Sequence, residues 1–285
     1  MAAAHPHALA DSPQPVAARG ELAQALAAVR ARLGLIALLF VLAGTAWWAT
    51  AERMAGMDAG PGTDLGALGW FLGAWVVMMA AMMFPSVAPT VALFSRMTAR
   101  HGITRPLMFT GGYLAVWSAA GLASFAFFAA GRGLLGDQLA WDRAGRWLAA
   151  GTLFAAAAYE LTPVKDACLS RCRSPLGFLL GNWRDGARGA LTMGTRHGAW
   201  CLGCCWALMA ALFALGVMSL TWMIVVAALI ALEKTLPWAR AAAWSTTLVL
   251  VVLAVWVAAA PGTLPGLTVP GDDASPGIGQ MQTMR

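Results

Sequence analysis

The sequence predicts an all-α protein, a polytopic bundle of about seven transmembrane helices with its N-terminus in the cytoplasm and its C-terminus outside. Of its 285 residues, 60% are hydrophobic and only 11% are charged, with a mean hydropathy of +0.68. A soluble domain usually carries about 25% charged residues. The apolar runs are long and lack the period-2 alternation of barrel strands, and helices satisfy their own backbone groups in lipid. The basic residues are also distributed unevenly between the two sides.

Seven apolar segments approach the ~20 residues that span a bilayer. They are residues 33–50, 65–84, 107–131, 146–161, 198–218, 220–236 and 241–260. The first could be a signal peptide, because Ala49-Thr50-Ala51 resembles a cleavage site. The polar region before it is long for that role, so we expect a retained helix. Pro85 and Pro89 predict a kink or a break after the second segment.

Charge and composition divide the chain into three parts. We expect residues 1–33 to form a disordered or amphipathic tail and residues 34–260 to form the membrane domain. Residues 261–285 are expected to form a second, disordered tail. Of the 19 lysines and arginines, 14 fall on the side of the N-terminus and five on the other, which makes the first side cytoplasmic. These scattered basic residues set orientation and do not indicate nucleic-acid binding. The expected surroundings are the lipid bilayer of a bacterial inner membrane.

The only segment with evident chemistry is residues 159–206, on the predicted cytoplasmic side. It holds all five cysteines of the chain and one of its four histidines. At ~100° per helical residue, the histidine and the last three cysteines share one sector of a helix, and the first two cysteines are an i, i+4 pair. Thiolates and an imidazole suit Cu(I), Zn(II) or an iron–sulfur centre. We therefore predict a soft-metal site, with Cu(I) favoured over Zn(II), at Cys168, Cys172, His197, Cys201, Cys204 and Cys205.

Methionines of the second apolar segment form a second candidate set. Two i, i+4 pairs place their thioethers on neighbouring faces of one helix, and thioethers bind Cu(I) weakly. We consider them as transfer ligands, although packing of the core is the simpler interpretation. These residues are Met78, Met79, Met82 and Met83.

Three charged residues fall in the last turns of predicted membrane helices. They are Glu160, Glu233 and Lys234. Charges near hydrocarbon are costly and often functional, so they are candidates for an accessory role beside the cysteines. Snorkelling to the membrane interface is the alternative.

Three classes of function remain open at this stage. The first is a metal-handling membrane protein that transports or delivers its metal, with a metal chaperone or a periplasmic protein as partner. The second is a membrane thiol or redox enzyme, in which Cys201 and Cys204 exchange electrons. The third is an assembly subunit whose cysteines merely pack. Six clustered soft ligands exceed what a thiol oxidoreductase needs, so the first class is favoured and no catalytic residue is assigned.

Five short blocks of the chain are similar to a known family. They are residues 78–85 (Met-Met-Ala-Ala-Met-Met-Phe-Pro), 159–165, 168–176, 197–206 and 233–234. In these blocks the sequence resembles the domain of unknown function 2182 family, predicted metal-binding integral membrane proteins, over residues 34–260. The resemblance implies a metal-binding membrane protein, and it implies no reaction.

Overall fold

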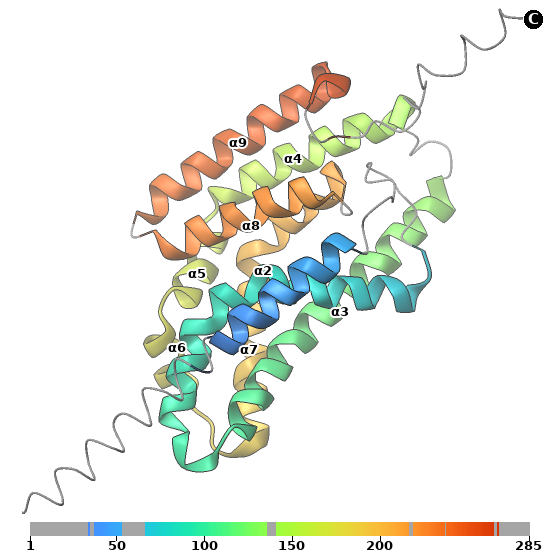
Figure 1. Cartoon of the computed structure of the whole chain (residues 1–285). Helices are drawn as coiled ribbons and strands as arrows, with labels where there is room; N and C mark the ends of the chain where they lie inside the picture. Colours follow the sequence, from blue (N-terminus) through green and yellow to red (C-terminus); the bar gives the residue numbers. More distant parts are fainter. Residues whose placement is uncertain are drawn as a thin grey trace, which may run out of the picture.

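The computed structural model describes residue 34 and residues 37–52, 66–135, 141–216, 219–236, 238–264 and 267. Within these residues the chain forms nine α-helices, so the all-α prediction is confirmed (Figure 1). They are Ala37–Glu52, α2 (Leu68–Met97), α3 (Thr104–Leu135), α4 (Arg146–Glu160), α5 (Pro163–Cys172), α6 (Pro175–Gly181), α7 (Gly186–Leu215), α8 (Leu220–Thr235) and α9 (Ala239–Ala259). The predicted tail 1–33 lies outside the described residues, as does most of the tail 261–285.

Four helices are long and apolar enough to cross a membrane. These are α2, α3, α7 and α9. Large apolar side chains face outward on two of them, where Phe127, Leu134 and Leu248 are more than half exposed, as expected for surfaces that meet lipid. These features suggest an integral membrane protein. The count of seven spans and the direction of the N-terminus stay predictions.

Two helices differ in extent from the sequence prediction. Helix α2 continues through Pro85 and Pro89, since burial against α3 and α8 supports a segment that proline would break in water. Helix α7 begins at Gly186 instead of residue 198. Residues 173–196 contain five glycines and would read as a turning loop from the sequence, yet they include α6 and the first turns of α7. The cysteines Cys201, Cys204 and Cys205 therefore lie in the middle of α7.

Helix α7 is the centre of the bundle and contacts α3, α4, α5 and α8. Helix α7 crosses α3 closely, because a glycine of each helix lies against the backbone of the other helix. A Cβ on Gly194 would come within 2.0 Å of the Phe109 carbonyl oxygen, and one on Gly112 within 2.3 Å of the Leu191 carbonyl oxygen. Helix α4 runs along α9, and the short helices α5 and α6 lie at one edge of the bundle (Figure 1).

Candidate metal centre

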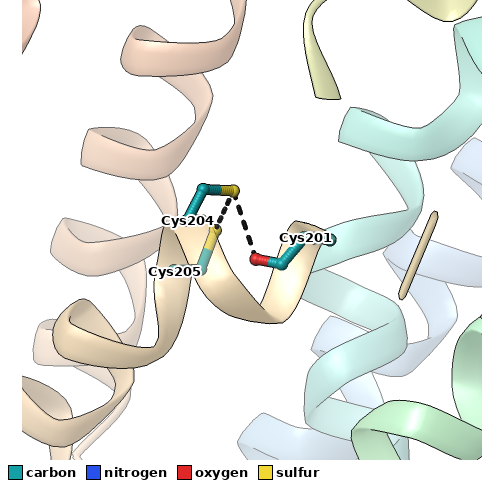
Figure 2. A group of neighbouring side chains, drawn as sticks. All are labelled: Cys201, Cys204 and Cys205. Atoms are coloured by element: carbon teal, nitrogen blue, oxygen red, sulfur yellow. Dashed lines mark hydrogen bonds between the residues drawn. The ribbon is translucent and has the colours of Figure 1, made fainter. Parts of the chain in front are cut away.

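Three cysteine sulfurs meet in the interior of the protein. Cys201, Cys204 and Cys205 are buried on α7, and their Sγ atoms all lie within 4.8 Å of one another. In Figure 2 dashed lines join the Cys204 sulfur to the Cys205 sulfur and to the Cys201 carbonyl oxygen. The first distance is 3.4 Å, and the Cys204 thiol donates to the carbonyl oxygen at 3.1 Å. The spacing i, i+3, i+4 turns all three side chains to one side of the helix.

The second cysteine block reaches the same place from α5. Thr162 begins this helix by accepting from the Lys165 backbone N–H, and Pro163 fixes its first turn. The Cys172 sulfur lies 3.8 Å from that of Cys204. Cys168 lies one turn earlier against Gly203, where a Cβ would come within 2.7 Å of its sulfur. The structure thus brings Cys172 next to Cys204, outside the group of three sulfurs that all lie within 4.8 Å of one another, and places Cys168 against Gly203.

Both thiols of α5 hold their protons more firmly than a free cysteine. Burial raises the pKa of Cys168, against an opposing effect of the Arg171 guanidinium. The pKa of Cys172 is raised well above its ordinary value, first by hydrogen bonding with Cys201 and then by burial, against an opposing contact with Cys204. A soft metal bound here would displace these protons, since it is the thiolate that ligates.

Two polar side chains from other helices contact the Cys201 sulfur. The Lys234 ammonium of α8 donates to it at 3.1 Å and to the Ser86 hydroxyl of α2 at 3.3 Å. The Tyr113 hydroxyl of α3 lies 3.1 Å from the same sulfur. Tyr159 of α4 donates to the Gly203 carbonyl oxygen at 2.7 Å, within the cysteine segment. Four helices, α3, α5, α7 and α8, therefore carry or contact the sulfurs, and the Lys234 ammonium is a cation beside them.

His197 lies in an aromatic pocket. Its ring centroid is 4.8 Å from that of Phe178, 5.9 Å from that of Phe109 and 6.0 Å from that of Tyr113. The side chain is buried, and its Nδ1 has no hydrogen-bond partner among the described residues. The structure does not group it with the three sulfurs of α7, so a ligand role for His197 stays a prediction.

The remaining candidates lie around this centre. Met78, Met79, Met82 and Met83 are all buried in α2. The Ser86 hydroxyl, which Lys234 contacts, donates to the Met83 carbonyl oxygen at 2.8 Å, so the end of the methionine segment is close to Lys234. Glu160 and Glu233 are buried as well and both contact the Lys165 ammonium. They do not snorkel.

Sequence reasoning missed Lys165, Tyr113 and Ser86. Each meets its partner across a long sequence separation, 68 residues between Lys165 and Glu233 and 88 between Tyr113 and Cys201. A signal did exist for Lys165, because it follows Glu160, an acidic residue at the end of a predicted membrane helix, by five residues. Tyr113 is one of only two tyrosines in the chain, but the helical pattern of the sequence does not indicate that it contacts Cys201.

The four sulfurs suit a soft monovalent or divalent ion. A metal bonded to thiolates at about 2.3 Å holds two of them roughly 3.8–4.6 Å apart. The Cys172–Cys204 sulfur distance of 3.8 Å lies in this range, the Cys204–Cys205 sulfur distance of 3.4 Å is shorter, and the three sulfurs of α7 all lie within 4.8 Å of one another. Thiolate donors select Cu(I) or Zn(II) over hard cations. The Cys204 and Cys205 sulfurs would have to move slightly apart to hold one ion at such distances.

Comparison with known families gives one match. A family model described as PpoB2, copper chaperone, matches residues 72–257. The match runs from α2 to α9 and includes the methionine segment and both cysteine blocks. It overturns the resemblance to the domain of unknown function 2182 family, and the assignment is corrected accordingly. The short blocks behind that resemblance reveal soft metal ligands but do not discriminate between families that share such ligands. Comparison with the curated proteins and with the solved structures finds no match.

Proposed function

The chain belongs to the PpoB2 copper chaperone family, and we propose that it holds Cu(I) among Cys172, Cys201, Cys204 and Cys205 before passing the ion on. Copper handling follows from the family and from the buried cysteine triad. The ligand assignment rests on one contact between two helices: the Cys172 sulfur of α5 lies 3.8 Å from the Cys204 sulfur of α7. Copper is the cargo here.

The surroundings of the sulfurs can offset part of the charge of a metal–thiolate centre. A Cu(I) thiolate centre carries net negative charge, which is costly in a poorly solvated interior unless a cation compensates it. Lys234 supplies that charge at 3.1 Å from Cys201. The methionines of α2 are weaker, neutral ligands and suit a transfer step better than storage.

The setting we propose is a bacterial inner membrane, crossed with the N-terminus inside and the C-terminus outside. The excess of basic residues on one side supports this orientation. Delivery requires a recipient, and a soluble metal chaperone or a periplasmic protein would fill that role. We place the route of handover at α5, because this helix of 10 residues has an exposed outer side and carries Cys172 next to Cys204.

The proposal is tested by measuring Cu(I) bound to detergent-purified protein in competition with a chromogenic Cu(I) chelator. We expect wild type to retain copper and a variant with serine at all five cysteines to lose it. Zn(II) in parallel competition is expected to bind more weakly, because Zn(II) is a borderline-soft ion whereas Cu(I) is soft. Equal copper retention by the cysteine-free variant, at matched thermal stability, would end the proposal. Reversible oxidation of the cysteines by a partner, without metal binding, would instead favour a thiol relay.

Lys234 offers a second measurement at the same site. Changing Lys234→Met removes the charge that faces Cys201 and keeps an unbranched side chain. We expect Cu(I) affinity to fall roughly 10- to 100-fold, the range typical of outer-shell changes at metal sites. Lys234→Arg keeps the cation and should retain most of the affinity. Wild-type affinity in Lys234→Met would show that the ammonium does not compensate the bound ion.

A further inference from the structure

A buried group of three charges lies outside the sulfur site. Lys165 of α5 is 1% exposed, and its ammonium contacts Glu160 of α4 and, at 2.7 Å, Glu233 of α8. The second oxygen of each carboxylate has no hydrogen-bond partner among the described residues. The lysine is thus the contact through which all three helices are joined at this point. The ion triad of Glu160, Lys165 and Glu233 shares no residue with the proposed copper ligands.

Stability alone is a poor explanation of such a triad. Burying charges costs solvation, and well-packed apolar residues of similar volume often serve a fold as well or better. What a buried ion pair can provide is a fixed arrangement of the elements that carry its charges. Here that arrangement concerns α5, a helix of 10 residues whose outer side chains, Val164, Asp166, Ala167 and Ser170 among them, are exposed.

Lys165 and Cys172 lie on the same side of α5. Seven residues are almost two full turns at ~100° per residue, so both side chains face the bundle. Cys168 and Leu169, which are buried, lie between them. Lys165 therefore holds one end of the side of α5 that faces the bundle. Cys172 lies at the other end, with its sulfur 3.8 Å from the Cys204 sulfur. Glu233 is in turn adjacent to Lys234, which contacts Cys201.

We propose that Lys165 is a positioning residue: the ion triad seats α5 over the sulfurs so that Cys172 serves as a removable fourth ligand. This inference rests on the proposed copper function. With the triad intact, α5 covers the three cysteines of α7. When α5 lifts, Cys172 leaves with it, and an ion held by three thiolates is exposed on the side from which the helix departed. The triad thereby sets the rate of copper release.

The first test needs no metal. In full-length protein with serine at Cys168, Cys201, Cys204 and Cys205, the half-buried Cys172 has a basal rate of maleimide labelling, and an increase in that rate reports that α5 lifts more often. A neutral triad, Glu160→Gln, Lys165→Met and Glu233→Gln together, leaves no unpaired buried charge. We expect labelling to become about tenfold faster, and Lys165→Arg, which keeps the cation, to stay near the parent rate. An unchanged rate in the neutral triad would overturn the positioning role.

The second test measures copper release. Transfer of bound Cu(I) to bathocuproine disulfonate is expected to be roughly 10- to 100-fold faster in the neutral-triad variant. In a Cys172→Ser background the same three changes should add little, since the triad acts through that ligand. Equal acceleration in both backgrounds would show general loosening and overturn the inference. A wild type that binds no Cu(I) would instead defeat the proposed function, while the labelling result would stand by itself.

Discussion

Replacing Cys201 and Cys204 together by serine is expected to remove most Cu(I) binding, and the further loss of Cys168 and Cys172 is expected to add little. Serine keeps the volume of cysteine and exchanges a soft sulfur for a hard oxygen. If both cysteine pairs bind one ion, losing either pair leaves an incomplete site. The losses of binding free energy caused by the two double substitutions are then not additive. The contact of Cys172 with Cys204 at 3.8 Å is the reason to expect one shared ion.

The measurement is Cu(I) retained against a chelator series for the wild type, each double variant and the fourfold variant. Met209→Leu is a matched control, because Met209 is another buried sulfur residue of α7, placed beyond the cysteines. It should bind as wild type does. Cys168→Ser alone should weaken binding less than Cys172→Ser, since the Cys168 sulfur rests against Gly203. Two partial losses that add in the fourfold variant would indicate two independent sites.

Gly194→Val is expected to cause the largest loss of stability of any single change considered. The position has no room, since even a Cβ would lie 2.0 Å from the Phe109 carbonyl oxygen, and backbone cannot step aside as a flexible side chain can. Forcing α3 and α7 apart should cost about 3 kcal/mol or more, at or above the upper end of overpacking effects. It would also withdraw Tyr113 from Cys201, which pair across the same interface at 3.1 Å.

Thermal unfolding in detergent, followed by the monodisperse fraction on size exclusion, measures this effect. The control is Gly111→Ala in α3, next to Gly112, because a Cβ at Gly111 meets nothing within 4 Å. That variant should unfold within a few degrees of wild type. If Gly194→Val were equally stable, the close crossing of α3 and α7 would not exist in the protein, and the placement of Tyr113 would have to be revised.

Periodicity in the sequence is enough to anticipate the helical fold and the common side of Cys201, Cys204 and Cys205, since both depend only on residues a few positions apart. The start of α7 is not predictable in this way. Its first turns contain Gly186, Gly189 and Gly194, which read as loop because glycine is a poor helix former in isolation. In the bundle these small residues are an advantage, because they let α3 approach closely.

Pairings between distant segments are equally hidden. Glu160 and Glu233 read as interfacial charges because the single sequence does not show that Lys165 meets both. The same holds for Lys234, whose partner Cys201 lies 33 residues away on another helix. The composition of the site could therefore be predicted, whereas the charges that surround it follow only from the packing of α5 and α8 against α4 and α7.

The two tyrosines have a practical consequence for spectroscopy. The chain contains 14 tryptophans but only Tyr113 and Tyr159, and both hydroxyl groups contact the cysteine segment, at the Cys201 sulfur and the Gly203 carbonyl oxygen. Fluorine-labelled tyrosine would thus place two NMR probes at the proposed copper site and none elsewhere in the protein. One probe would sense the sulfur directly and the other the backbone between the ligands, so loading, release and handover could be followed in a chain with every cysteine intact.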